Sequence, residues 1–298
     1  MAPASLRRAC PLLGTYVDIS AAGSDHRDLV AAVDAALAVV EKIHRLMSFH
    51  DPASDVSRLN REAALGPVAV DPWTWRVLDA AVDLNRRLRG AFDITVAPML
   101  QDLGLLPSGA DRAGSACAPA PSDTIELMSD RRVHFRHAAR IDLGGVAKGF
   151  AVDRAVAMLR MRNVTSGLVN AGGDLAAFGP HPQTIHLRDP RDPTRSIGAI
   201  DIRAEALAST GGRFDPFTSA AIAPPAVIDP QARAPARTIC GVTVRAPTCL
   251  LADALTKVVM IEGEAAAPLL DQFAAAALMV RADGEIVVTP SWQAARAA

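Results

Sequence analysis

Two glycine pairs in the middle of this chain most constrain how it can fold. Gly144-Gly145 follows residues 140–143 and precedes a helical pattern over 147–160, and Gly172-Gly173 follows the apolar run 165–169. Glycine lets the backbone turn sharply and approach a ligand closely because it carries no Cβ. The pattern predicts strand, turn and helix, followed by a second strand and turn. If the two strands pair, the two turns lie near each other.

Helices and strands are both predicted outside this segment. Asp71 and Pro72 suit the start of a helix, and Gly90 suits its end. Apolar periodicity predicts the other helices over residues 24–47, 250–262 and 265–274. Alternation and short apolar runs predict strands over 14–20, 184–188, 196–203, 239–244, 276–280 and 285–288, with a strand-like run over 90–98.

The mixed order of these elements indicates the fold class. Strands and helices do not strictly alternate, which favours an α+β protein over a doubly wound sheet. A chain of 298 residues that is 50% hydrophobic is able to bury a large core. We therefore expect a single compact domain over residues 1–298, with its core at about 8–290. Residues 107–122 are predicted to form a surface loop, and most of 206–237 is also predicted to be loop.

Charge and cysteine content exclude several classes of protein. The formal net charge of −1 provides no basic surface for nucleic acid or for an anionic membrane. The four cysteines form no C-x-x-C pair, which argues against a zinc knuckle and fits a reducing compartment. No run approaches the roughly 20 apolar residues of a membrane span. We expect a soluble cytoplasmic protein without membrane insertion.

Three short segments carry candidate chemistry, each with a simpler structural interpretation. DLGGVAKG (142–149) places Lys148 at a helix start, where an ammonium and free N–H groups bind phosphate, or it is an ordinary turn with a solvated lysine. NAGGD (170–174) adds a second glycine turn, although Asn and Asp are common turn residues. GAFDITVAP (90–98) includes Asp93, which also suits a local turn.

A fourth segment, ADALTK (252–257), places Asp253 and Lys257 four residues apart on one helix face. One interpretation is a metal-binding carboxylate at the mouth of a site. The other is a surface ion pair, which contributes roughly 0.3–0.5 kcal/mol to helix stability. The spacing alone fits both.

These segments and four others occur in a characteristic order. The further segments are LLGTYVDI (12–19), MSFHDPASDVSRLN (47–60), LASTGG (207–212) and VIDP (227–230). In this order and spacing the chain resembles the FAD:protein FMN transferase (ApbE) family over about residues 8–290. The resemblance implies an ApbE-like α+β fold with FAD in a central cleft.

The resemblance also implies an activity. Members of the family use Mg²⁺ and FAD, and they transfer FMN to a threonine hydroxyl of a target flavoprotein with release of AMP. Phosphoryl transfer depends mainly on positioning and on neutralising charge, which glycine turns, a lysine and a cation provide. The implied partner is a flavoprotein that carries the acceptor threonine.

Site residues are assigned by the same resemblance. Asp253 and Lys148 are the implied catalytic residues, and the metal ligands are the Ala147 carbonyl, Asp253 and Thr256. Contacts with FAD are assigned to residues spread along the chain, namely Leu13, His50, Ala91, Phe92, Asp93, Asp142, Gly144, Gly145, Lys148, Gly172, Asp174, Thr210 and Gly211.

Four positions depart from the family pattern. Leu13 replaces a usual Met, His50 a usual Tyr, Ala226 a usual His, and Lys257 an oxygen ligand of the metal. Alanine cannot act as a general base, and a charged lysine has no lone pair for a metal. Thr256, one residue earlier, points about 100° away on a helix. Three functions follow: an FMN transferase, a non-catalytic FAD-binding paralogue, or an FAD pyrophosphatase.

Overall fold

The computed structural model describes residues 4–107, 120–212, 227–236 and 239–292. The chain forms two compact units. One, which we call the sheet unit, comprises residues 1–42, 148–225 and 237–298, and the second unit comprises 43–147 and 226–236. The expectation of one domain over the whole chain stays a prediction.

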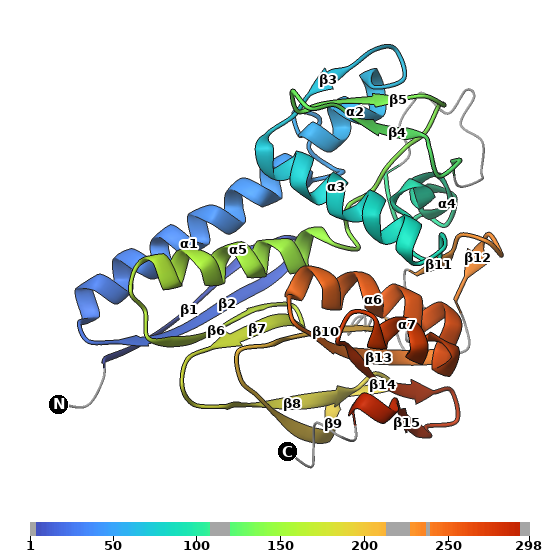
Figure 1. Ribbon diagram of the computed structural model, residues 1–298. Coiled ribbons are helices and arrows are strands. Elements are labelled where there is room, and N and C mark those ends of the chain that lie inside the picture. The colour runs from blue at the N-terminus through green and yellow to red at the C-terminus, as the bar shows by residue number, and fades with distance from the viewer. Residues whose placement is uncertain (1–3, 108–119, 213–226, 237–238, 293–298) are drawn as a thin grey trace. The chain divides into compact units, whose positions relative to one another are not determined.

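The sheet unit is built on eight antiparallel strands (Figure 1). Neighbouring strands are joined in antiparallel ladders throughout. Hairpins connect β1 to β2 and β6 to β7, which is possible because an antiparallel pair needs only a short turn. The strand order is β1 (Ala4–Leu12), β2 (Thr15–Gly23), β6 (Ser166–Ala171), β7 (Asp174–Phe178), β10 (Ala206–Gly211), β13 (Ile239–Ala246), β14 (Ala276–Arg281) and β15 (Ile286–Val288).

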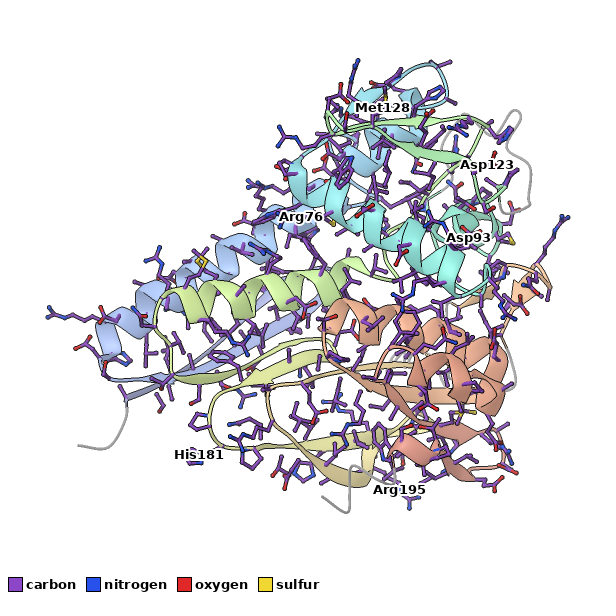
Figure 2. All side chains as sticks on the ribbon, viewed as in Figure 1. Arg76, Asp93, Asp123, Met128, His181 and Arg195 are labelled. Carbon is purple, nitrogen blue, oxygen red and sulfur yellow. The ribbon has the colours of Figure 1, made fainter. Side chains whose placement is uncertain are left out.

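Helices cover one face of this sheet and a two-stranded ribbon covers the other (Figure 1). The helices are α1 (His26–Met47), which belongs to this unit as far as Lys42, α5 (Ala147–Met161), α6 (Cys249–Glu262), η2 (Gly263–Ala266) and α7 (Ala267–Asp271). The ribbon pairs β8 (Gln183–Asp189) with β9 (Asp192–Ile202), and His181 and Arg195 mark its two ends (Figure 2). Leu187, Ile202 and Trp292 pack beneath the sheet in one buried cluster.

The second unit combines helices with small sheets. Its helices are α2 (Asp55–Glu62), α3 (Pro72–Arg87), η1 (Ile94–Val96) and α4 (Ala97–Asp102). A three-stranded sheet has the order β3 (Val68–Ala69), β5 (Arg132–Phe135) and β4 (Ile125–Leu127), and β11 (Ile228–Asp229) pairs with β12 (Ala234–Pro235). The buried α3 stripe of Val77, Ala81 and Leu84 supplies much of its core.

Most predicted elements are confirmed, and the α+β class with them. α1, α3, α6 and the closing hairpin β14–β15 lie where the periodicity placed them. Asp71 caps α3 by accepting a hydrogen bond from the Trp73 N–H at 2.8 Å, and Gly90 has a φ of +81° after the helix ends. Within the described ranges, no helix is both long and apolar enough to cross a membrane.

Two strand predictions were wrong, and one strand was not predicted. Residues 140–143 form no strand because the side chain of Asn60 binds both the N–H and the carbonyl of Ile141. Residues 90–98 turn into η1 and α4 because Asp93 caps the Thr95 N–H and Pro98 lies in the first turn of a helix. β10 lies in a segment predicted to be loop, since its small residues carry little strand signal without the flanking β7 and β13.

The second predicted strand and its glycine turn are confirmed, and the turn leads into another strand. The pair Gly172-Gly173 joins the antiparallel strands β6 and β7. Gly172 and Gly173 have φ values of +67° and +104°, which glycine tolerates best in a tight hairpin. β1, which precedes the predicted first strand, extends the sheet by one more strand.

Candidate functional site

Two turns and the end of one strand lie at the same end of the strands in the large sheet. Leu13 and Gly14, with φ values of +56° and +70°, form the β1–β2 turn. A Cβ on Gly172 would overlap the Thr15 side chain, so the β6–β7 turn lies against the start of β2. β10 finishes at this same end of the sheet with Thr210 and Gly211, and Gly173 faces Ser209 there.

Lys148, in the first turn of α5, connects this end of the strands to α6. Its Nζ lies 2.6 Å from Asp174 Oδ2, at the start of β7, and 3.6 Å from Asp253 Oδ2 on α6. The Gly149 N–H also donates to Asp253 Oδ2 at 3.2 Å. Residues from α5, β7 and α6 therefore form one cluster, and the interpretation of Lys148 as a freely solvated lysine is wrong.

Lys257 completes the cluster from the next turn of α6. Its Nζ contacts Asp253 Oδ1 and donates a hydrogen bond to the Asp253 carbonyl oxygen at 2.9 Å. The Asp253 side chain is fully buried, which excludes the surface ion pair considered from the sequence. The ion pair exists, but it lies in the interior.

Burial divides the cluster into an inner and an outer part. The side chains of Asp174 and Asp253 are 3% and 0% exposed, whereas those of Lys148 and Lys257 are 29% and 18% exposed. Burial alone would lower the pKa of Lys148, but the charges of Asp253 and Asp174 outweigh it and raise that pKa. The Lys148 ammonium thus stays charged, and solvent meets the lysines rather than the carboxylates.

Asp153 supports the cluster without belonging to it. Its two carboxylate oxygens accept hydrogen bonds from the Cys249 and Leu250 N–H groups at 2.8 and 2.9 Å, which fixes the start of α6 on α5. Sequence reasoning missed this role, although α6 has no acidic residue in its own first turn. Burial, followed by the Asp174 charge, raises the pKa of the Cys249 thiol, so it is no thiolate nucleophile.

Thr256 faces into the protein. Its hydroxyl donates to the Asp253 carbonyl at 2.7 Å and lies 2.8 Å from the Thr210 hydroxyl, and the residue is fully buried. The pair ties α6 to β10. These contacts hold the Thr256 hydroxyl against β10 and the α6 backbone.

The start of α5 offers fewer free N–H groups than the sequence suggested. The Val146 and Ala147 N–H groups bond to the Leu143 carbonyl at 3.0 and 2.8 Å, and the Gly149 N–H is bound to Asp253. The helix N-terminus therefore offers a phosphate fewer donors than the sequence indicated, and the nearby cationic groups are the Lys148 and Lys257 side chains.

The other predicted site residues lie in the second unit. Asp93 lies beside α4 (Figure 2), and its Oδ1 accepts from the Thr95 N–H and hydroxyl at 2.7 and 2.8 Å. Burial raises the pKa of Asp93 despite these two bonds. Asp93 and Thr95 line a cavity of about 20 Å³, which has room for one water and not for a flavin ring.

The other predicted site residues of the second unit differ in how deeply they are buried. Ala91 and Phe92 are buried in the second unit, His50 is exposed, and Ala147 is buried at the first position of α5. The Asp142 carboxylate lies over Gly144, where a Cβ would come within 2.8 Å of Oδ2, and Gly145 follows in the same turn. Ala226 lies outside the described residues.

The predicted residues thus form two groups. In the sheet unit, ion pairs and hydrogen bonds join Lys148, Asp174, Asp253, Thr256 and Thr210. The same unit also holds Leu13, Gly172 and Gly211. The second unit holds His50, Ala91, Phe92, Asp93, Asp142, Gly144, Gly145 and Ala147. Their roles toward FAD stay predictions.

The implied Mg²⁺ fits these side chains poorly. Among the described residues, no three His, Cys, Asp or Glu side chains are grouped so that they could hold a metal ion. Asp253 is already bound by two ammonium groups and an N–H, and Thr256 is bound within the protein. Mg²⁺ requires several free oxygen ligands in octahedral geometry. In this arrangement Asp253 is not free to bind Mg²⁺, and the assignment of Ala147, Asp253 and Thr256 as metal ligands stays a prediction.

Comparison with known proteins identifies relatives along most of the chain. FAD:protein FMN transferases of Rhodobacter capsulatus and Vibrio cholerae are 29% and 26% identical over 95% and 81% of this chain. The matched regions cover 57% and 75% of those relatives, so this chain spans little more than half of the first. The corresponding enzyme of Klebsiella pneumoniae is 25% identical over 92% of this chain and 83% of its own length.

Solved structures show the same fold. The ApbE protein of Thermotoga maritima superposes with a TM-score of 0.84 at 26% identity, covering 98% of this chain and 99% of that one. The flavinyl transferase ApbE of Pseudomonas stutzeri gives a TM-score of 0.83 at 22% identity, covering 99% and 98% of the two chains. The family model for ApbE matches residues 13–280, and this chain therefore belongs to the ApbE family.

Proposed function

We propose that this protein is a flavin transferase that moves the FMN moiety of FAD onto a threonine hydroxyl of a target flavoprotein and releases AMP. The relatives in the family are named FAD:protein FMN transferases, which supports the class of reaction. The acceptor threonine is the part of this proposal that the family resemblance implies, and the location in the cytoplasm rests on the cysteine content of the sequence.

The cluster of Lys148, Lys257, Asp174 and Asp253 is the observation that carries the proposal. Two partly exposed ammonium groups lie over two buried carboxylates, so the surface of the cluster is cationic. An ammonium group is a compact charge that suits a phosphate oxygen. In this role Lys148 and Lys257 neutralise the pyrophosphate of FAD, and the carboxylates hold the two lysines in place.

Charge neutralisation at this place serves the transfer directly. Phosphoryl transfer is accelerated when positive charge is held where negative charge develops on the phosphate and the leaving group. The leaving group in this reaction is AMP. Asp153 and the packing of α5 on α6 keep the lysines in a fixed position, so little rearrangement is needed during the reaction.

A second candidate function is FAD binding without transfer. The ion pair of Lys257 with Asp253 favours it, because the carboxylate implied as a metal ligand is occupied by a cation of the protein. An FAD pyrophosphatase, in which water replaces the threonine, is the third alternative. All three use the same phosphate-binding cluster and differ in what happens to the bound FAD.

One experiment distinguishes the three functions. Purified protein is incubated with FAD, with and without a flavoprotein domain that carries a candidate acceptor threonine, in Mg²⁺ and in EDTA. AMP together with a covalently fluorescent acceptor supports the transferase, and an acceptor domain with threonine replaced by alanine is the control. AMP release that does not need the acceptor indicates a pyrophosphatase. Bound FAD that stays intact in all conditions indicates a binding protein and contradicts the proposal.

A further inference from the structure

Lysine is scarce in this protein, and it is concentrated at one place. The chain has 31 Lys and Arg residues, and only Lys42, Lys148 and Lys257 are lysines. Two of these three meet at the buried Asp253. Lys257 is thus part of a specific arrangement and not one of many surface cations.

The oxygens of Asp253 are all engaged by groups of the protein itself. Lys257 Nζ binds Oδ1 and the backbone carbonyl, while Lys148 Nζ and the Gly149 N–H approach Oδ2. The Thr256 hydroxyl donates to the same carbonyl. A divalent cation bound to Asp253 would have to displace the Lys257 ammonium and then lie close to two positive charges.

The charges of the cluster are balanced without a metal. Its two lysines, Lys148 and Lys257, are matched in number by two aspartates, Asp174 and Asp253. The carboxylates are inaccessible, whereas 18% of the Lys257 side chain and 29% of the Lys148 side chain are exposed. An approaching anion therefore meets two ammonium groups that the interior already holds in position.

We propose that the Lys257 ammonium is the resident cation of this site, so that the cluster binds the pyrophosphate of a dinucleotide without a divalent metal. This inference rests on the proposed function, since it assumes that FAD is the ligand. It changes the expected chemistry of the site, because a fixed ammonium on the protein supplies one charge at the place where Mg²⁺ would supply two. Threonine at position 257 would restore an oxygen and remove the competing charge.

The first test measures metal binding without any flavin. Mn²⁺ is titrated into the wild type, Lys257→Thr and Lys42→Thr, and free Mn²⁺ is followed by electron paramagnetic resonance. Lys42 lies on α1 and provides the matched loss of a lysine at another place. We expect no binding by the wild type or Lys42→Thr and stoichiometric binding by Lys257→Thr. Stoichiometric Mn²⁺ binding by the wild type would overturn the proposal whether or not the variant folds.

The second test measures FAD binding by the same proteins in EDTA and in Mg²⁺. For the wild type we expect a dissociation constant that changes by less than about twofold between the two conditions. For Lys257→Thr we expect affinity in EDTA to fall roughly tenfold to hundredfold, as for a lost hydrogen bond to a charged group. Added Mg²⁺ is expected to restore part of that loss.

The outcomes distinguish a failure of the role given to Lys257 from a failure of the proposed function. Wild-type protein that binds FAD only with Mg²⁺ would refute the role of Lys257 and leave the proposed function intact. Wild-type protein that binds no FAD in either condition would refute the proposed function, while the Mn²⁺ titration would still decide whether Lys257 excludes a metal.

Discussion

The backbones of α5 and α6 touch at Gly149 and Cys249. A Cβ on Gly149 would overlap the Cys249 carbonyl oxygen and lie 2.7 Å from the Leu250 Cα. Asp253 follows Cys249 by one helical turn, and Lys148 directly precedes Gly149. The close approach therefore places the carboxylate of one helix beside the ammonium of the other.

Gly149→Ala is expected to destabilise the protein and to disturb the cluster. The new methyl group would meet backbone atoms, which cannot rotate away as a side chain does, so the two helices must separate. Overpacking of this kind typically costs about 1–3 kcal/mol. Urea unfolding measures the loss, and Gly66→Ala is the matched control because a Cβ there meets no atom within 4 Å. Equal stability of the two variants would contradict the close contact.

Local signals in the sequence were sufficient for the long helices α1, α3, α5 and α6, whereas the short helices α2 and α4 were not predicted. α3 was predicted with both ends because Asp71, Pro72 and Gly90 mark them, and the i, i+4 spacing placed Asp253 and Lys257 on one face. Both features depend on residues within a few positions of each other, and this is where periodicity and capping rules apply.

These local signals could not predict which strands pair when they lie far apart in the sequence. β10 was missed because Ala206, Ala208 and Gly211 have weak strand propensity, and the strand exists through its pairing with β13 and β7. The contact of Lys148 with Asp174 depends on that same strand order, so spacing along the chain could not predict it. The Asn60 bonds to Ile141, 81 residues away, replaced a predicted strand for the same reason.

Asn60→Ala is expected to loosen the segment that leads into α5. The Asn60 amide donates to the Ile141 carbonyl at 3.0 Å and accepts from its N–H at 2.7 Å. Loss of both bonds leaves two backbone groups without these partners, at a cost of about 1–3 kcal/mol. Asn60→Asp keeps the acceptor but sets a carboxylate oxygen against the Ile141 carbonyl, so it should also be less stable than the wild type. Thermal unfolding of the three proteins tests this expectation, and a variant as stable as the wild type would argue against the anchor.

Asp153 is expected to make stability depend on pH in a mildly acidic range. Burial raises the pKa of Asp153 to about 6, against the opposing effect of its bonds to the Leu250 and Cys249 N–H groups. The folded state therefore holds this proton more tightly than the unfolded state, whose aspartate has an ordinary pKa of about 3.9. The resulting contribution to stability is present below pH ~4 and is lost as the pH rises to ~6, by roughly 3 kcal/mol.

Asp153→Asn should remove that part of the pH dependence. The difference in unfolding free energy between wild type and variant, measured by urea at several values from pH ~4 to ~7, isolates this group from other carboxylates. A difference that stays constant with pH would show that Asp153 has an ordinary pKa in the folded protein.

FAD is expected to bind more tightly than riboflavin. In the proposed function Lys148 and Lys257 bind phosphate oxygens, which riboflavin lacks, while the ring is common to both ligands. Fluorescence titration of each ligand gives the two dissociation constants, and we expect a ratio of roughly ten or more. The preference should shrink as salt is added, because screening weakens contacts between exposed charges. Equal affinities would mean that the cluster does not face the ligand.

Asp253→Asn is expected to destabilise the sheet unit. The substitution leaves Lys148 and Lys257 with only Asp174 to balance them and places a buried amide where both lysines met a carboxylate, at a cost of about 1–3 kcal/mol. Lys257→Met alone should also destabilise, because Asp253 then loses its closest partner. The double variant restores the charge balance through the Lys148–Asp174 pair, so it should be more stable than the sum of the two single losses by about 1–3 kcal/mol. Urea unfolding of the four proteins measures this coupling. Strictly additive losses would mean that Asp253 and Lys257 do not interact, and the account of Lys257 as a resident cation would fail with them.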